Sequence, residues 1–151
     1  MAAQLARARV LAILEHWEKE LHEIFKCYAA ADMEGDALST TDSVNLAELM
    51  FMVKEGKLLD DRLSGAKVQQ IFTQVNAAEA EEEEGDDDES ELVYDEWALC
   101  VARICDAKIP EEARGGNPFE YTLQAWLDLV FVPTYKQLLK DKRKGTASRT
   151  L

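Results

Sequence analysis

Carboxylates are the side chains of this sequence most able to bind a ligand, since 30 of its 151 residues are Asp or Glu. Residues 79–91 hold ten of them and no base, which leaves a net charge of only −3 for the rest of the chain. Such a run usually forms a solvated face rather than a catalytic pair. Asp and Glu carboxylates can coordinate a hard cation such as calcium. We expect a solvated acidic insertion with no ordered metal, and weak calcium binding is the alternative.

The other residues with reactive side chains do not form a pattern for catalysis. His16 and His22 are six residues apart in a helical pattern and point about 120° away from each other, so they cannot share a metal ion. Cys27, Cys100 and Cys105 are an odd number of thiols without a CxxC pair, which is typical of buried, reduced cysteines. The sequence contains no glycine-rich phosphate loop and no HExxH or GxSxG motif. We therefore expect a protein that is not an enzyme.

Charge and hydropathy argue against several classes of partner. The net charge of −13 disfavours binding to nucleic acid and to anionic lipid. No apolar run reaches the ~20 residues that span a bilayer, and residues 1–7 lack the features of a secretory signal. We therefore expect a cytoplasmic protein with no membrane partner. Only the C-terminal end is basic, and its bases are Lys140, Lys142, Arg143, Lys144 and Arg149.

Apolar residues recur at steps of three and four over most of the chain, and this period predicts helices. The first predicted helix runs without interruption over residues 5–28, and the second covers residues 45–57. Gly56, near the end of the second helix, is suited to a left-handed residue. A third helix is predicted to begin near Ser64, whose hydroxyl can cap it.

Helices are also predicted after the acidic run. The fourth begins near Tyr94. Residues 117–120, Asn-Pro-Phe-Glu, have the order of an N-cap, a first-turn proline and an acid three residues after the cap. A fifth helix is expected to run from there until Pro133 stops or kinks it, and a short sixth helix covers residues 134–142. No segment alternates with a period of two, so the predicted fold class is all-α.

Two parts of the chain share one internal layout. They are Ile24-Phe25-x-x-Tyr28 followed by Val44 and Glu48, and Ile71-Phe72-x-x-Val75 followed by Leu92 and Glu96. In each part, Phe-x-x-apolar ends a helix, a loop follows, and a glutamate comes four residues after an apolar loop residue. This layout resembles the EF-hand family over roughly residues 10–106. It is most similar to the EF-hand-like modules of ciliary and flagellar (axonemal) proteins, whose loops are often long and metal-free.

The resemblance implies a particular role for four of these residues. In an EF-hand pair, the apolar loop residues form a small strand pair and the glutamate closes the calcium site with two oxygens. Val44 and Leu92 would therefore pair, and Glu48 and Glu96 would hold the closing positions.

The loops depart from those of a working calcium site. The first ligand position of the first loop falls on Ala29, and the two loops have 20 and 21 residues instead of 12. Counted back from Glu96, a 12-residue loop would begin at Gly85 and place Asp87 and Glu89 at the next ligand positions. Because Gly85 offers no carboxylate, we expect no calcium requirement.

The resemblance also divides the chain and implies a function. Residues 1–109 would form an EF-hand-like pair, and residues 110–151 a C-terminal helical extension with a basic tail. A paired EF-hand has a groove that accepts an apolar helix. Met50, Phe51 and Met52 are the predicted partner-binding residues, because Met suits adaptable surfaces and Phe51 lies off the predicted core face. The alternative is that these three only pack inside the protein.

The expected function is thus that of a structural or adaptor subunit that works without calcium. Its partner would be an apolar helix of another protein or a larger cytoskeletal or axonemal assembly. A weak calcium sensor or buffer that uses the second loop is the alternative. A third reading is binding driven by charge, in which the acidic run and the basic tail each bind a partner of opposite sign.

Overall fold

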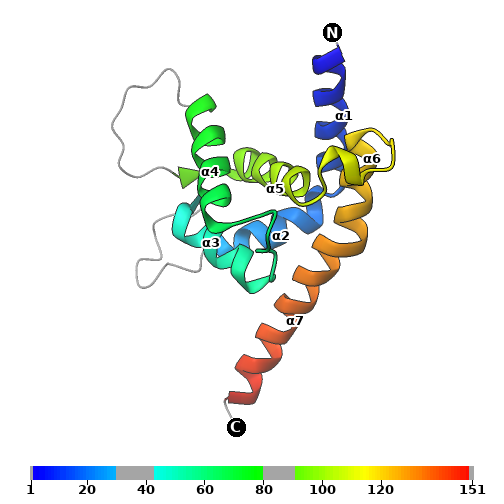
Figure 1. Cartoon of the computed structure of the whole chain (residues 1–151). Helices are drawn as coiled ribbons and strands as arrows, with labels where there is room; N and C mark the ends of the chain where they lie inside the picture. The colour runs from blue at the N-terminus through cyan, green and yellow to red at the C-terminus, as the bar shows by residue number, and fades with distance from the viewer. Residues whose placement is uncertain (1, 30–42, 80–90, 150–151) are drawn as a thin grey trace.

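The computed structural model describes residues 2–29, 43–79 and 91–149, and within these ranges the chain is mostly helical, which confirms the all-α class (Figure 1). Residues 80–90 of the predicted acidic insertion therefore lie outside the described part. The helices are α1 (Ala2–His16), α2 (Glu18–Ala29), α3 (Leu46–Glu55), α4 (Gly65–Glu79), α5 (Tyr94–Lys108), α6 (Phe119–Trp126) and α7 (Val132–Arg149). The shorter elements are the strands β1 (Val44–Asn45) and β2 (Glu91–Leu92), the 3-10 turn η1 (Glu111–Ala113) and the π-helical turn η2 (Leu127–Phe131).

The N-terminal helix is divided at Trp17, so the prediction of one unbroken helix over residues 5–28 was wrong at this point. Helical hydrogen bonding still crosses the division, since the Trp17 N–H donates to Ile13 O at 3.2 Å and the Leu21 N–H donates to Trp17 O at 2.9 Å. The Trp17 indole N–H donates to Gln124 of α6 at 3.3 Å. A tertiary contact thus anchors the residue at which the helix direction changes.

The two strands join the two helix pairs and form the antiparallel pairing that the sequence predicts. Val44 lies opposite Leu92, and both side chains are fully buried. Each strand leads into a helix whose third residue is a glutamate. Glu48 accepts from the Asn45 N–H at 2.9 Å, and Glu96 accepts from the Val93 N–H at 3.0 Å. The two glutamates in the closing positions therefore cap α3 and α5 as the third helical residue of a capping box does, by accepting a hydrogen bond from the N–H of the N-cap residue.

The turn between α3 and α4 differs from prediction in its backbone conformation. Ser64 caps α4 as expected, because its hydroxyl oxygen accepts from the Lys67 N–H at 3.1 Å. Gly56, however, is right-handed with a φ of −80°, and the left-handed residue is Lys57 with a φ of 56°. A reason other than backbone conformation must therefore account for a glycine at position 56.

The C-terminal helices run on from one another, which corrects two predictions. Pro133 does not end the helix, because the π-helical turn η2 precedes it. In this turn the Val132 N–H donates five residues back, to Leu127 O. This wider turn relieves the clash between a proline ring and the carbonyl one turn earlier. Asn117 is not the cap of α6, whose N-cap is Pro118, and its side-chain amide donates to Arg114 O at 3.1 Å.

One hydrophobic core contains residues from the helix pairs and from the C-terminal segment. Its bulkiest members form a chain of aromatic contacts. Phe25 and Trp97 have ring centroids 5.5 Å apart, Trp97 and Phe131 6.4 Å, Phe131 and Tyr135 4.7 Å, and Tyr135 and Tyr28 6.0 Å. Residues 127–135 thus lie between side chains of the predicted EF-hand-like pair.

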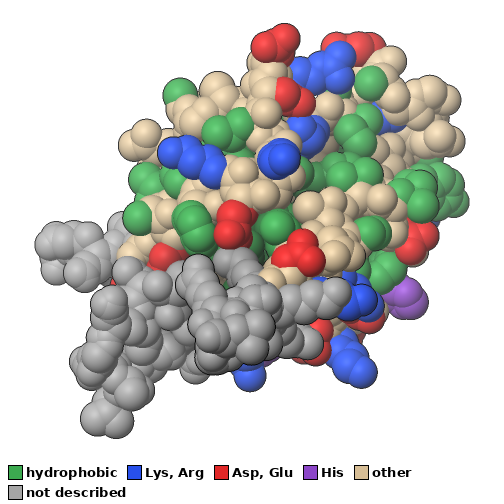
Figure 2. Space-filling model, turned by 90° about the horizontal axis from the view of Figure 1, so that it is seen from below, with side chains coloured by type: hydrophobic (Ala, Val, Ile, Leu, Met, Phe, Trp, Pro, Cys, Tyr) green, Lys and Arg blue, Asp and Glu red, His purple; other side chains and the backbone are tan. Residues whose placement is uncertain are grey.

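The described surface mixes apolar and charged side chains. Figure 2 looks from below Figure 1 and shows hydrophobic side chains in small groups separated by acids and bases on the described part of that face. None of the described helices is both long and apolar enough to span a bilayer.

Candidate functional site

The three residues predicted to bind a partner have different environments on α3. Met52 is fully buried, which corrects its assignment, because in this fold its side chain is part of the core. It shares the core face of α3 with Leu49 and Val53, at helical spacing. Met50 is partly buried against the core. Only Phe51 is exposed, at 44%, and its ring packs edge-on against Tyr28 with centroids 5.8 Å apart.

The C-terminal segment of this chain packs against α3 at Met52 and Gly56. Tyr135 of α7 is fully buried, and its hydroxyl donates to Met52 O at 2.6 Å. Its ring packs so close to Gly56 that a Cβ at that position would lie 2.5 Å from Tyr135 Cζ. Gly56 is therefore explained by the approach of Tyr135. This part of α3 is therefore covered by residues of the same chain.

The candidate metal ligands do not form a site within the described residues. Asp87 and Glu89 lie outside those residues. Glu96 is described, and one of its oxygens caps α5. Among residues 8–29, 43–76 and 91–141, no group of three or more His, Cys, Asp or Glu side chains is placed to hold a metal ion.

The histidines and cysteines also lack an arrangement for catalysis. His22 packs against the ring of Tyr94 with centroids 4.5 Å apart, and His16 lies edge-on to Trp17. Cys100 and Cys105 are buried, and burial raises the pKa of each thiol to about 12. Both thiols are therefore protonated at neutral pH and are poor nucleophiles.

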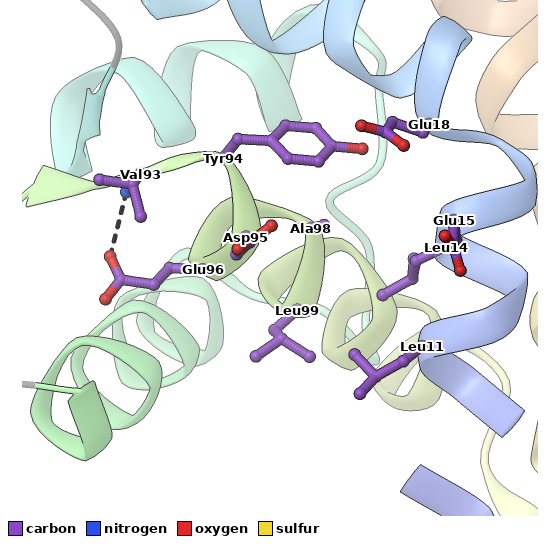
Figure 3. A pocket seen from close by; sticks show the side chains of 10 residues that line it. All are labelled: Leu11, Leu14, Glu15, Glu18, Val93, Tyr94, Asp95, Glu96, Ala98 and Leu99. Atoms are coloured by element: carbon purple, nitrogen blue, oxygen red, sulfur yellow. Dashed lines mark hydrogen bonds between the residues drawn. The ribbon is translucent and has the colours of Figure 1, made fainter. Parts of the chain in front are cut away.

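A groove between α1 and α5 has the features of a binding site (Figure 3). It has a volume of about 540 Å³ and is lined by Leu11, Leu14, Glu15, Glu18, Val93, Tyr94, Asp95, Glu96, Ala98 and Leu99. We call it the acidic groove, because four of these ten residues are acids and none is a base. Two large apolar side chains are exposed in it, Leu11 at 42% and Val93 at 52%.

The acidic groove combines an apolar floor with a charged rim. In Figure 3, Leu11 and Leu14 of α1 lie across from Leu99 of α5, while Glu15 extends from α1 and Glu18 from the start of α2. Leu11, Leu14 and Glu15 are three to four positions apart along α1, which puts them on one side of that helix. The packing of α1 against α6 and of α2 against α5 holds the two walls in place.

Tyr94 gives the groove one uncharged polar group. Burial, followed by the charges of Glu18 and Asp95, raises the pKa of its phenol to about 12, so the hydroxyl stays protonated at neutral pH. Its oxygen is buried and has no hydrogen-bond partner among the residues that the structure describes. In Figure 3 the hydroxyl points toward Glu18. The groove thus offers negative charge, apolar surface and a neutral hydroxyl, a combination suited to binding rather than to acid–base chemistry.

The acidic groove was not predicted from the sequence. Leu11 lies beside the predicted core stripe through Val10 and Leu14, and this second apolar position was the available signal. Glu15 was predicted to face solvent, which is confirmed. Val93 stands between strand and helix, and only the fold brings it near α1. Comparison of the chain with protein-family models, curated proteins and solved structures finds no match.

Proposed function

We propose that this chain is a non-enzymatic structural or adaptor protein that binds a basic, apolar segment of another protein in the acidic groove. The observation that carries the proposal is the lining of this groove, which has four carboxylates, no base and two exposed apolar side chains. An amphipathic helix with apolar residues three and four apart, flanked by Lys or Arg, has the complementary chemistry. Protein binding is also the function expected from the sequence, but the proposed site is the acidic groove instead of Met50, Phe51 and Met52.

The two parts of the lining have different tasks in this proposal. Leu11 and Val93 are removed from water when the partner binds, and this burial supplies most of the affinity. Ion pairs at an exposed rim stabilise by only about 0.2–1 kcal/mol each. Glu15, Glu18 and Asp95 therefore select a basic partner and speed its association more than they tighten the complex.

We further propose that binding does not require calcium. Calcium coordination by Glu96 would compete with its cap on the Val93 N–H, which counts against the alternative of a weak calcium sensor. The pairing of Val44 with Leu92 supports a degenerate EF-hand pair that is held together by packing. The resemblance to axonemal modules suggests a cytoplasmic assembly of cilia or flagella, and the localisation of a tagged protein in ciliated cells tests this setting.

Charge reversal in the groove tests the proposed function. The probe is a fluorescent amphipathic helical peptide of about 20 residues with Leu on one face and Lys on the other, and its binding is followed by anisotropy. Glu15→Lys combined with Asp95→Lys should weaken binding by roughly tenfold, since two attractions become repulsions. The matched control, Glu23→Lys with Glu112→Lys, has the same net charge and changes two exposed acids outside the groove. Equal loss in both variants would refute the acidic groove as the site.

A further inference from the structure

Most of the large apolar side chains that are exposed in the described part of the chain lie on two surfaces. Six large hydrophobic side chains are exposed among the described residues, and Leu11 and Val93 belong to the acidic groove. Three of the other four lie on the C-terminal helices, namely Tyr121 at 63%, Leu129 at 72% and Val130 at 39%. A single exposed leucine is ordinary, but three such side chains close together mark a candidate interaction surface.

These three side chains border one shallow hollow. It has a volume of about 320 Å³, and its lining also includes Ile109, Trp126 and Ala125. Tyr121, Ala125 and Leu129 are four residues apart, so they follow one line along α6 and η2. The π-helical turn places the three successive exposed residues 128–130 between buried Leu127 and Phe131. Turns of this kind occur frequently at functional sites.

A basic helix, α7, follows these residues in the chain. Lys136 and Lys140 of α7 are exposed, and Lys142, Arg143 and Lys144 follow in the same helix. Two acids lie in residues 121–149: exposed Asp128 beside Leu129, and Asp141, which accepts from the Gln137 amide at 3.0 Å. Figure 1 shows α7 extending beyond the other helices to the C-terminus. We call residues 121–141 of these helices the C-terminal ridge, since its first part is mainly apolar and its second part carries Lys136 and Lys140.

The charge of the ridge comes from α7 and not from the hollow. Arg114 is the one ionisable basic residue in the lining of the hollow, and it pairs with Asp106. Its guanidinium also lies over the ring of Phe119, 4.8 Å from the ring centroid. Arg114 is thus held within the protein, whereas Lys136 and Lys140 point to solvent.

We propose that the C-terminal ridge is a second docking surface, and that it binds an acidic segment with an apolar anchor from another protein. The anchor would lie on the hollow between Tyr121 and Leu129, and the acids would lie along Lys136 and Lys140. Nucleic acid would leave the apolar half unused, and binding to an anionic bilayer is an outcome that the test below distinguishes. Because the acidic groove selects the opposite charge, the chain would join a basic partner to an acidic one.

Two peptide probes and two pairs of variants test this inference. The acidic probe is a fluorescent peptide of about 20 residues with Leu at helical spacing in its first half and Glu in its second half. Leu129→Ser and the charge reversal Lys136→Glu with Lys140→Glu should each weaken its binding roughly tenfold. The matched controls, Val93→Ser and Lys19→Glu with Lys26→Glu, change exposed residues elsewhere and should stay within about twofold of the parent. Higher salt should weaken binding to the parent protein.

The result separates this inference from the proposed function. Ridge variants should bind the basic peptide like the parent, while Val93→Ser should weaken that peptide and leave the acidic peptide unchanged. Unchanged thermal unfolding of Leu129→Ser would show that the fold is intact, as the exposure of Leu129 predicts. If the acidic peptide binds the ridge variants as tightly as the parent, the ridge is not its site. A second result would also overturn the inference: the parent protein floats with phosphatidylserine vesicles, the ridge variants do not, and the acidic peptide does not bind the parent. The ridge would then bind a membrane surface.

Discussion

Replacing Gly56 by alanine should destabilise this protein, although its backbone conformation favours the substitution. Gly56 has a right-handed φ of −80°, which alanine adopts without strain. Removing the freedom of glycine from the unfolded chain would then stabilise by about 0.4–1 kcal/mol. The added methyl group, however, would overlap the Tyr135 hydroxyl and lie 2.5 Å from Cζ. Tyr135 would have to move, and it is fully buried.

The expected magnitude follows from what Tyr135 would lose. Overpacking of a close-packed core costs about 1–3 kcal/mol. Displacement of the ring also breaks the hydrogen bond from its hydroxyl to Met52 O, which contributes about 0.5–1.5 kcal/mol. Met52 O keeps its second bond, from the Gly56 N–H at 3.0 Å, so no bare carbonyl remains. With the backbone gain subtracted, Gly56→Ala should lower the free energy of unfolding by about 1–4 kcal/mol.

A double-mutant cycle with Tyr135→Leu tests the reasoning. Leucine lacks the Cζ, Cε and hydroxyl atoms that approach Gly56, so alanine at position 56 should be neutral or stabilising in that background. Urea unfolding of the parent, the two single variants and the double variant gives the coupling energy between positions 56 and 135. Residues in contact have coupling energies of about 0.5–3 kcal/mol, and we expect a value in this range. If Gly56→Ala costs the same in both backgrounds, Tyr135 is not the reason for the glycine.

Three further predictions concern the site and the core. Calorimetry should find no calcium site tighter than about 10 μM, and a chelator should leave the melting temperature unchanged, because Glu96 caps a helix; a tighter site would restore the sensor alternative. A hydrogen bond from Lys108 and two backbone N–H groups hold the pKa of Asp60 below its ordinary value of about 3.9. Its contribution to stability is therefore present above about pH 4 and lost as the pH falls through the lowered pKa, so Asp60→Asn should flatten the acid limb of melting curves recorded between pH 5 and pH 2. Trp97→Ala should cost about 3–5 kcal/mol in urea unfolding, since Trp97 is fully buried at the centre of the aromatic contacts, and a loss below about 1 kcal/mol would contradict that role.

Features that depend on neighbouring residues could be predicted from the sequence. The Ser64 cap and the helix after Asn45 follow from residue types within one turn. The pairing of Val44 with Leu92 is long-range, but it could be predicted because the same short layout occurs twice. Hydrophobic period alone also separated helix from strand, so the fold class was accessible.

Features that depend on how helices meet could not be predicted in this way. A glycine near a helix end suggests a left-handed turn, and nothing near Gly56 in the sequence indicates a tyrosine 79 positions later. Met52 and Phe51 are adjacent in sequence, yet only the packing of α3 decides which is buried. The acidic groove needs Leu11 of α1 to lie near Val93, the residue before α5, and no local pattern connects them.

The position of Phe131 and Tyr135 also bears on how the protein is made. These residues complete a core whose other large members, such as Phe25 and Trp97, come earlier in the chain. During translation, residues 1–109 are made before Phe131 and Tyr135. Until Phe131 is in place, Trp97 lacks part of its cover, and a premature stop codon between the codons for Gly116 and Phe131 would make that exposure permanent. Such truncated products should be recognised by chaperones and degraded.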